Sequence, residues 1–451
     1  MAIVSVKKLS QLEGQKRIDA EYYQPEYSLI RQKLNEIETR RVKELSTSVV
    51  SFGAYSLCNY IEWRKEGVPY LNVENIRDGY IDFEEVKRID DNVNEILKKS
   101  QVREGQVLLT MAGTIGNAAV AYKLPGKVNS NQATAKITLK PGVSPFFITA
   151  FLNSYFGRKQ TEWEIVTSVQ PNIFLWQIEN IRVPLVSKEL EHEIEAIYRE
   201  ALDKLGSSKS FYSQAENLLI KKLGLKGFKP NYELSYRASL SKAFGVHRVD
   251  AEYFQPKYEA LIDSIKQFQL AKLGQLARRT VTKLKPEDDV QYKYIEINDV
   301  EPGIGEINYT ERLGKELPPN ARIPINGGEL IISKVRPTRG AISIVPIELR
   351  QNVICSSAFS VFRAESPLKE YLYITTRSMV GKLQMERPTT GTSYPTIRDA
   401  DVEDIQIPIV SEEVQQRISS LVLQSHEARK KAKELLEEAK SKVENLIEGK
   451  A

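Results

Sequence analysis

The chain has 451 residues, of which 41 % are hydrophobic and 27 % charged, so it is long enough for two or three domains and its composition argues against disorder. No run approaches the roughly 18 consecutive apolar residues of a membrane-spanning helix, and the opening residues do not resemble a secretory signal, so we expect a cytoplasmic protein. The net charge of +5 permits a polyanionic partner but does not require one.

The first half of the chain predicts a short helix, a long β-rich segment and a long helix, in that order. The motif RIDAEYYQPEY occupies residues 17–27 and leads into a short helical stretch. Short β-like runs separated by turn signals follow, such as Val107–Thr110 and Lys136–Leu139. A proline-led stretch, Pro171–Ser187, then precedes a helix that we expect from about Lys188 to Leu223.

The second half repeats the first. Residues 248–258 read RVDAEYFQPKY and match the first motif at eight of its eleven positions. β-like runs such as Glu329–Ser333 and Ala358–Phe362 follow, then the stretch Pro395–Ser411 and a helix expected from about Glu412 to Ile447. The motif recurs after 231 residues and the proline-led stretch after 224, so the chain is one half-molecule written twice. A period this long indicates domain duplication and not a solenoid.

Both long helices have coiled-coil spacing, in which apolar residues recur at alternating steps of three and four. In the first helix they are Leu190, Ile194, Ile197 and Ala201, then, after a break near residues 204–208, Phe211, Ala215 and Leu218. In the second they are Val414, Ile418, Leu421, Ala428, Ala432, Leu435, Ala439 and Leu446. A pseudo-two-fold axis between duplicated halves would reverse one helix relative to the other, so we predict that these residues form an antiparallel interface in a spacer between two heads. Two separate helices, each packed on its own domain, are the alternative.

Together these features predict an α+β fold with two globular β-rich domains, joined by two long antiparallel coiled-coil helices and related by a pseudo-two-fold duplication. The expected boundaries are a first domain at 1–187, a first helix at 188–224, a second domain at 225–411 and a second helix at 412–451.

The sequence contains no recognisable catalytic constellation. Gly113–Gly116 is not followed by the GK[ST] of a phosphate-binding loop, and the Asn/Asp-Pro-Pro-aromatic motif of amino-methyltransferases is absent. Of the three histidines, His192 and His426 fall on the predicted long helices, where a solvated helix face explains them better than a general base does. The third is His247.

No metal site is expected either. Cys58 and Cys355 are far apart in sequence and lack CxxC neighbours, so we expect reduced thiols and no zinc site. Asp78 with Glu85-Val86-Lys87 could hold a metal ion in a nuclease, but the flanking residues are typical of a charged surface hairpin and the second half has no equivalent. The chain therefore looks like a binding protein and not an enzyme.

The order of these segments resembles the specificity subunits of type I restriction–modification systems. The resemblance rests on DAEY[YF]QPxY, a variable β-rich segment containing LLTMAGTIG, a stretch ending in I-x-[VI]-P-[LI]-V-S and a long helix, all present twice and covering nearly the full length. In that family each half holds one target recognition domain, and the helices form the spacer on which modification subunits dock.

The resemblance implies a non-catalytic subunit that reads a bipartite, asymmetric sequence in double-stranded DNA. It implies two modification (methyltransferase) subunits and restriction (motor–nuclease) subunits as partners. It also implies S-adenosylmethionine, ATP and magnesium held by those partners, with no cofactor in this chain. The alternatives are a stand-alone duplicated DNA-binding regulatory protein, and a methyltransferase or nuclease with a divergent active site.

Candidate DNA-contacting residues follow from what readout requires: arginine, lysine, asparagine or glutamine on loops for bases, and lysine, arginine or hydroxyls for phosphates. In the first domain they are Tyr55, Arg64, Lys65, Asn72, Asn75, Arg77, Asn117, Asn129, Asn131 and Gln132. In the second they are Lys283, Lys285, Asn298, Lys334, Arg336, Arg339, Asn352, Thr389, Thr390 and Thr392. A solvated loop side chain is the alternative for each. We interpret the acidic and aromatic DAEY motifs as packing residues, at the spacer ends or against a methyltransferase.

Overall fold

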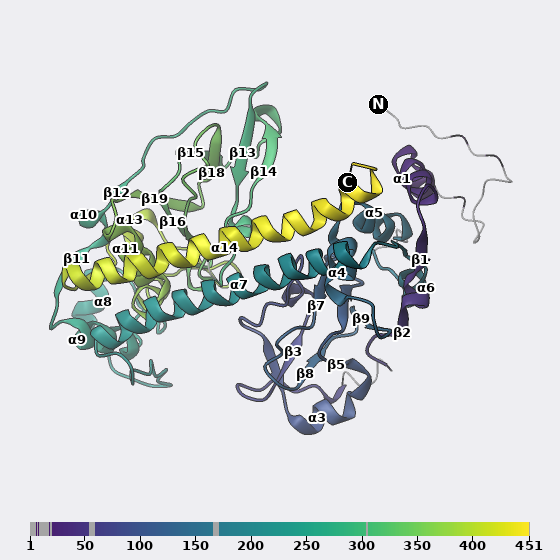
Figure 1. Cartoon of the computed structure of the whole chain (residues 1–451). Helices are drawn as coiled ribbons and strands as arrows, with labels where there is room; N and C mark the ends of the chain where they lie inside the picture. Colours follow the sequence, from purple (N-terminus) through teal and green to yellow (C-terminus); the bar gives the residue numbers. More distant parts are fainter. Residues whose placement is uncertain are drawn as a thin grey trace. The chain divides into compact units, whose positions relative to one another are not determined.

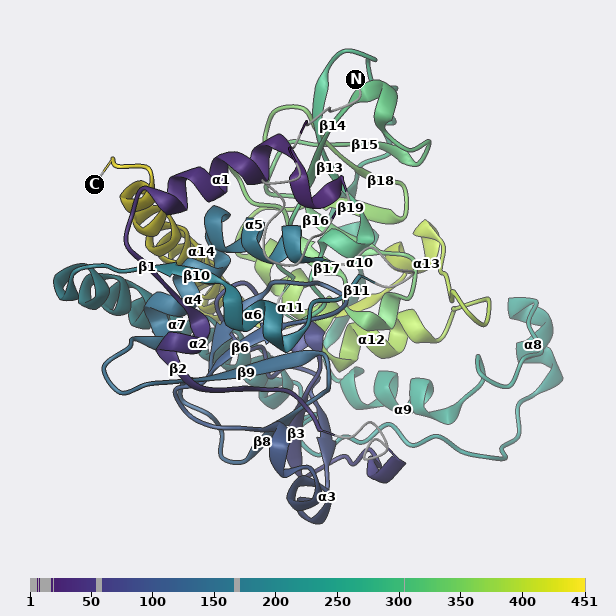
Figure 2. The same ribbon diagram turned by 90° about the vertical axis from the view of Figure 1, so that its right-hand side faces the viewer.

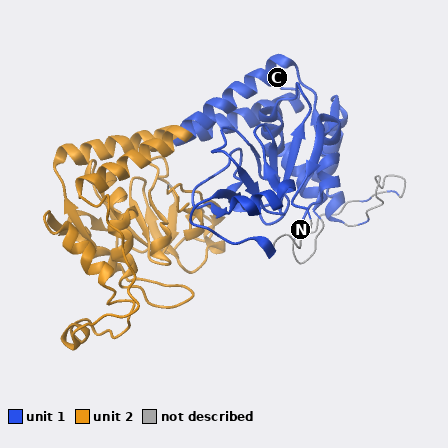
Figure 3. Cartoon of the chain, turned by 90° about the horizontal axis from the view of Figure 1, so that it is seen from below, with its two compact units in different colours: residues 1–205, 429–451 blue, residues 206–428 orange. Residues whose placement is uncertain are grey.

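The computed structural model describes residues 6, 8, 18, 20–53, 59–165, 171–303 and 305–450. The chain divides into two compact units (Figure 3): unit 1 comprises residues 1–205 and 429–451, and unit 2 comprises residues 206–428. Arg17, Asp19, Tyr55 and Cys58 lie outside the described residues, so Tyr55 stays a candidate on sequence grounds alone. In the part of the chain that the structure describes, no helix is long and apolar enough to cross a membrane.

Unit 1 combines β-sheets with short helices (Figure 1). Its helices are α1 (Pro25–Asn35), α2 (Val42–Leu45), α3 (Asp91–Ile96), α4 (Pro145–Asn153), α5 (Tyr155–Glu164) and α6 (Leu175–Asn180). Its strands are β1 (Thr39–Arg41), β2 (Ser46–Val50), β3 (Val68–Leu71), β4 (Lys87–Ile89), β5 (Gln101–Val102), β6 (Val107–Thr110), β7 (Ala118–Val120), β8 (Val128–Ser130), β9 (Thr134–Leu139) and β10 (Arg182–Pro184). The strands pair in the orders β2-β9-β6-β7, β4-β3-β8-β5 and β1-β10, and β3 and β8 run parallel.

Unit 2 repeats this construction. Its helices are α8 (Leu240–Val246), α9 (Pro256–Ile265), α10 (Leu273–Leu276), α11 (Leu368–Arg377), α12 (Met379–Glu386) and α13 (Asp399–Glu403). Its strands are β11 (Gln269–Lys272), β12 (Arg278–Arg279), β13 (Gln291–Ile295), β14 (Thr310–Leu313), β15 (Ala321–Ile325), β16 (Leu330–Ser333), β17 (Ile342–Ile344), β18 (Val353–Ser356), β19 (Phe359–Arg363) and β20 (Gln406–Ile409). The orders β12-β19-β16-β17, β14-β13-β18-β15 and β11-β20 match those of unit 1, with β13 and β18 as the parallel pair.

Strand β6 shows why the β-rich segments read as continuous apolar runs. Val107 and Leu109 belong to the main core of unit 1, whereas Leu108 belongs to a second core that residues of both four-stranded sheets share. All three side chains are fully buried. A strand buried on both faces has no polar face to alternate with, so its sequence is apolar throughout.

The repeated motif starts a helix in each unit. Pro25 and Pro256 are the first residues of α1 and α9, a position where proline loses no hydrogen bond. Tyr27 and Tyr258 are buried, as are the residues three and seven positions after each, so each helix packs one stripe on its own unit. The motif therefore includes packing residues, as expected. Tyr27 shares its core with Val443 and Ile447, and Tyr258 shares its core with Leu219 and Leu223, all of which lie near the ends of the predicted long helices.

The two long helices are α7 (Lys188–Lys222) and α14 (Glu412–Ile447), close to their predicted bounds. In unit 1, Ile194 and Ala201 from the first half of α7 share a core with Leu435 and Ala439 from the second half of α14. In unit 2, the second half of α7 shares a core with the first half of α14. The helices therefore pair antiparallel (Figure 1), which confirms the predicted fold class. The four consecutive domains stay a prediction, because each compact unit takes half of each helix.

Burial along α7 includes several predicted seam residues and adds one. Ile194, Ala201 and Ala215 are fully buried, whereas Leu190, Ile197, Phe211 and Leu218 are half-buried. Ser208, seven residues from both Ala201 and Ala215, is also buried, so the heptad pattern does not break near residues 204–208. Tyr198 is buried too, but its hydroxyl donates to the Gly79 carbonyl oxygen, so its burial does not mark the seam. In α14, Val414, Ile418, Leu421, Ala428 and Leu435 are all buried.

A serine pair fills the seam in unit 2. The hydroxyl oxygens of Ser208 and Ser425 lie 3.1 Å apart, and the Ser425 hydroxyl donates to the Ser208 carbonyl oxygen at 2.8 Å. Both side chains are buried and both are satisfied, so small polar residues continue the heptad pattern where the sequence appeared to interrupt it.

Candidate nucleic-acid interface

Two loops of unit 2 are joined into one surface. In the loop after β16, the Arg336 amide donates to the Pro395 carbonyl oxygen at 2.7 Å. The Lys334 carbonyl oxygen of the same loop accepts from the Ile397 amide at 2.9 Å. The second loop closes on itself through two hydrogen bonds between Thr390 and Thr396. Loop Lys334–Gly340 and hairpin Pro388–Ile397, which the sequence separates by about fifty residues, therefore present their tips together.

Two arginines occupy this surface in different ways. Arg336 has a left-handed backbone with φ of 48°, and its guanidinium lies over the Tyr394 ring, 4.4 Å from the centroid. It also donates to the Ser393 carbonyl oxygen at 3.1 Å, so it holds the hairpin tip. Arg339 is exposed, and its side chain bonds to none of the residues that the structure describes. Of the two, Arg339 is the one whose guanidinium is available to an external group.

The Lys334 side chain points into unit 2 and supports the loop. Its ammonium lies 2.9 Å from a carboxylate oxygen of Asp399, and its side chain is only 17 % exposed. Burial alone would raise the pKa of Asp399, but hydrogen bonds from Ser360 and Lys334 outweigh it and lower that pKa. The charge of Lys334 is therefore neutralised inside unit 2, at the base of the loop.

The other unit 2 candidates fall into two groups. Thr389, Thr390 and Thr392 belong to the hairpin, and Asn298 follows β13 at the same end of the parallel pair as the Lys334 loop. Asn352 precedes β18 at the opposite end of that pair. Lys283 and Lys285 are exposed on the segment before β13, where the Leu284 amide donates to the Arg322 carbonyl oxygen at 2.7 Å. Lys283, Lys285 and Asn352 are therefore not part of the two-loop surface.

Unit 1 gathers its candidates at the equivalent place. Asn72 and Asn131 follow the parallel strands β3 and β8, and the Asn131 amide donates to the Leu71 carbonyl oxygen at 2.9 Å. Asn117 donates from its side chain to the Ile76 carbonyl oxygen at 3.1 Å, which brings the loop after β6 to the same end. The candidates near this end are Asn72, Asn75, Arg77, Asn117, Asn131 and Gln132.

Most of these amides are engaged within unit 1. The Asn75 side chain donates to the Asp82 carbonyl oxygen at 3.0 Å and is buried. Asn117 accepts from the Arg158 guanidinium at 2.8 Å, and the Asn131 side chain accepts from Thr134 and from the Ala133 amide. These residues shape the loops, whereas Gln132 is exposed and bonds to no described side chain.

Three first-domain candidates lie elsewhere. Asn129 is fully buried and its side-chain amide donates to Asn94, so this residue does not lie at the surface where DNA could contact it. Arg64 and Lys65 precede β3, at the end opposite Asn72, and the Arg64 guanidinium pairs with Asp90 at 2.7 Å. The sequence placed Asn129 among the loop candidates because burial of a polar side chain depends on partners that only the fold brings together.

The charged hairpin of unit 1 docks on the long helices. The Tyr198 hydroxyl donates to the Gly79 carbonyl oxygen at 2.9 Å, and Lys440 pairs with Asp78 at 3.1 Å. Gly79 has φ of 98°, and a Cβ there would lie 2.6 Å from the Tyr198 hydroxyl. Asp78 therefore has a structural partner, which supports the hairpin interpretation over a nuclease site.

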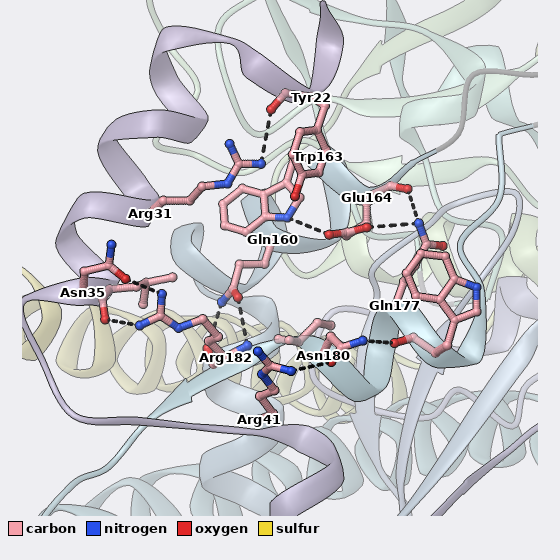
Figure 4. A pocket seen from close by; sticks show the side chains of 13 residues that line it. Tyr22, Arg31, Asn35, Arg41, Gln160, Trp163, Glu164, Gln177, Asn180 and Arg182 are labelled. Atoms are coloured by element: carbon pink, nitrogen blue, oxygen red, sulfur yellow. Dashed lines mark hydrogen bonds between the residues drawn. The ribbon is translucent and has the colours of Figure 1, made fainter. Parts of the chain in front are cut away.

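In unit 1, α1, α5, α6 and β10 lie near one another (Figure 2), and they enclose a pocket of about 350 Å³ (Figure 4). The Arg31 guanidinium lies 4.2 Å from the Tyr22 ring centroid and 4.6 Å from that of Trp163. Arg182 donates to the Asn35 side chain at 2.6 Å, and Arg41 to that of Asn180 at 3.2 Å. The walls are held by their own network, and their cationic and aromatic character would suit an anionic group at the rim. None of the candidates from the sequence lies here.

Sequence reasoning missed Tyr394 and Arg398. Tyr394 is 67 % exposed beside Arg336, and Arg398, at the foot of the hairpin, has an 82 % exposed side chain that pairs with Asp401. The available signal was an aromatic residue directly before Pro395, close to the hairpin threonines that were already candidates.

Residues 263–438 match the family model described as the type I restriction modification DNA specificity domain. The specificity subunit of the type I restriction enzyme EcoBI of Escherichia coli is 26 % identical over 221 residues, which are 48 % of this chain and 44 % of that protein. The match thus spans less than half of that relative. The specificity subunit of the type I restriction enzyme MjaVIII of Methanocaldococcus jannaschii is 24 % identical over 400 residues, 84 % of each chain. The solved S subunit of a type I restriction–modification system from M. genitalium aligns with 92 % of this chain and 96 % of its own, at 15 % identity and a TM-score of 0.41.

Proposed function

We propose, from the premise that this chain is a homologue of type I restriction–modification specificity subunits, that it is the DNA-reading subunit of such a complex. Each unit would read one half of a bipartite target. The chain would supply recognition, and partner subunits would supply methyl transfer and cleavage.

The observation that carries this proposal is the equivalence of the two loop surfaces. Each lies at the same end of a parallel strand pair inside an equivalent sheet, β3 with β8 in unit 1 and β13 with β18 in unit 2. The scaffolds correspond, but the residues on them differ. Gly113–Asn117 stands in unit 1 near the place that Arg336–Gly340 takes in unit 2. Equivalent scaffolds with different tips suit an asymmetric target, because base identity is read by the side chains at the tips.

The partner subunits follow from the same premise. We propose that two modification subunits bind this chain and that restriction subunits join them. The long helices offer charged outer faces beyond the seam, such as Glu193, which pairs with Lys442 at 2.8 Å. Because the net charge is only +5, we expect weak DNA affinity from the chain alone and higher affinity once the modification subunits add their own contacts.

The test is a titration of labelled duplex DNA at several fixed salt concentrations, with the chain alone and with its modification subunits. Target and scrambled duplexes are compared at each salt concentration, because phosphate contacts alone would give equal binding and an equal salt slope for both. We expect sequence discrimination from the complex. Full, sequence-specific affinity from the chain alone would contradict the dependence on partners, and equal binding of both duplexes by the complex would contradict the reading role.

A further inference from the structure

The arginine of the second DAEY motif reaches the hairpin that carries the unit 2 surface. The Arg248 guanidinium donates to the Pro388 carbonyl oxygen at 2.9 Å and to the Thr389 carbonyl oxygen at 3.0 Å. Arg248 precedes α9, whereas the hairpin follows α12, so the contact joins residues about 140 positions apart. Hydrogen bonds from a charged donor are about twice as strong as neutral ones, which suits a tether between separate segments.

The rest of the motif fixes the direction of this arginine. Asp250 accepts two hydrogen bonds from the Arg248 guanidinium, at 2.7 and 2.8 Å, and the Tyr253 amide donates to the same carboxylate. The guanidinium lies 4.6 Å from the Tyr253 ring centroid, and that of Arg387 lies 4.8 Å from the same centroid. The Arg248 hydrogen bonds lower the pKa of Asp250, so this pair is charged at neutral pH.

The hairpin is held from both sides. On its outgoing side, the Pro395 carbonyl oxygen accepts from the Arg336 amide of the neighbouring loop, and the Ile397 amide donates to the Lys334 carbonyl oxygen of that loop. On its incoming side, the Pro388 and Thr389 carbonyl oxygens accept from Arg248. Thr389 also bonds to the Glu386 carbonyl oxygen at the end of the preceding helix, but that contact is local, so Arg248 is the residue that ties this side of the hairpin to a distant segment.

We propose that Arg248 is a positioning residue that fixes hairpin Pro388–Ile397, and with it Arg336 and Tyr394, in the orientation needed to read DNA. The reading step rests on the proposed function, but the tether itself does not. Arg248 acts through the hairpin and does not touch DNA, because its side chain is only 21 % exposed and is engaged by Asp250 and the two carbonyl oxygens.

This role explains why the motif recurs while the loops do not. Arg248 and Asp250 match residues of the first motif after 231 positions, whereas the hairpin TTGTSYPTI has no matching tip in the first half. Residues that only position a loop can be the same in both halves. The loop that they position must differ if the two half-sites differ.

The first experiment measures hydrogen exchange of the free chain by mass spectrometry and needs no DNA. In Arg248→Gln, the amides of Thr390, Thr396 and Ile397 should exchange about tenfold faster, since a charge-assisted tether is lost, while peptides of β16 stay unchanged. Lys242→Gln is the matched control, because it removes an exposed cation of the same segment whose partner is Glu259 and not the hairpin. It should leave the hairpin amides unchanged.

The second experiment measures competition binding of the assembled complex with duplexes altered in one half-site at a time. Arg248→Gln should lower discrimination in one half-site about tenfold, and should change the other half-site and scrambled DNA less than about twofold. If Arg248→Gln does not fold, Arg248→Lys keeps the charge but not the forked contact, and it should show a smaller loss of the same kind.

Hydrogen exchange tests the tether, and competition binding tests the positioning role in DNA reading. Unchanged hairpin exchange in folded Arg248→Gln or Arg248→Lys would overturn the tether. Faster exchange with intact discrimination, or an equal loss on every duplex, would overturn the positioning role. If the wild-type complex itself discriminates no sequence, the proposed function fails together with the reading step, and the exchange arm still decides the tether.

Discussion

Lys136 is a cationic residue in the interior of unit 1. It has no exposed surface, and its ammonium donates to the Ser130 hydroxyl at 3.0 Å and to the Thr134 carbonyl oxygen at 3.3 Å, with no carboxylate partner among the described residues. Burial lowers the pKa of Lys136 from 10.5 to about 7. Because the unfolded chain binds the proton more tightly, Lys136 destabilises the native state fully below pH 7, and this cost declines as the pH rises from about 7 to 10.5.

Lys136→Met should therefore stabilise the protein in a pH-dependent way. The gain in unfolding free energy should be about 2–4 kcal/mol at pH 6 and about 1 kcal/mol at pH 10, because the proton-linked cost disappears as the lysine becomes neutral in the unfolded chain. Urea unfolding of both proteins at each pH measures the difference, in which other titrating groups cancel. A difference that does not vary with pH would show that Lys136 is charged in the folded protein.

Arg339 is the side chain most available to a guanine edge on the unit 2 surface. Arg339→Ala should cost about 1–3 kcal/mol of binding to the target and should relax preference in one half-site only, since a bidentate contact is lost. Competition binding of the assembled complex measures both effects. Lys315→Ala, which removes a cation that pairs loosely with Asp289, is the control and should leave the half-site preference unchanged. An equal loss on all duplexes with a shallower salt slope would instead indicate a phosphate contact.

For single residues, the sequence shows which polar side chains could contact DNA but not which of them are engaged inside the fold. It selected Arg336, Arg339 and the hairpin threonines as separate candidates for DNA contact, and only the fold brings their two loops together. It could not separate Lys334 or Asn129 from the exposed candidates. The partners that engage them, Asp399 and Asn94, lie 65 and 35 positions away in the chain.

In each unit, a glutamine side chain bonds to the backbone of an edge strand as a neighbouring strand would. Gln160 donates to the carbonyl oxygen of Arg182 at 2.9 Å and accepts the amide of the same residue at 2.9 Å, at the start of β10. Gln384 bonds to both backbone groups of Gln406, at the start of β20, in the same way. Each amide thus satisfies the open edge of a two-stranded sheet, which would otherwise leave buried backbone groups without partners.

Gln160→Glu should destabilise the protein by about 1–3 kcal/mol at neutral pH, because the carboxylate cannot donate to the Arg182 carbonyl oxygen and leaves it unsatisfied. Thermal or urea unfolding measures the loss. Gln32→Glu, on the exposed face of α1, introduces the same charge without touching an edge and should change stability by less than about 0.5 kcal/mol. Equal effects of the two substitutions would mean that the glutamine contributes nothing as an edge partner.

Elements with strong local signals could be predicted, and those that depend on pairing could not. β6, β9, β16 and β19 coincide with predicted apolar runs, and both long helices end within a residue or two of their predicted bounds. The two-residue strands β5 and β12 exist only because a neighbour is present, and no local pattern marks them. The same limit applies to Ser208, which lies in the seam opposite Ser425 although no apolar pattern marks it.

For the whole molecule, we propose that the two long helices set the length of the unread DNA segment, the gap, between the two half-sites. Four residues inserted between Leu205 and Gly206 in α7 add about 6 Å of helix at about 1.5 Å per residue, which is close to one turn and nearly restores the flanking seam. At about 3.4 Å of duplex per base pair, the target should lengthen its gap by one or two pairs and keep both half-sequences. Gel-shift selection from a library of gap lengths measures the preferred spacing. The same four residues inserted after Gly126, in an exposed turn, should leave the spacing unchanged.

Methylation-site mapping most directly tests the central claim that this chain reads DNA with two different heads. The chain is assembled with its modification subunits, the complex methylates a random-sequence library, and the modified positions are sequenced, once with the wild type and once with loop residues Arg336–Arg339 replaced by glycine and serine. We expect a bipartite, asymmetric target for the wild type. For the variant we expect a target in which one half has lost its sequence preference while the other half and the gap are retained. A single continuous target, or a variant that alters both halves alike, would contradict the central claim.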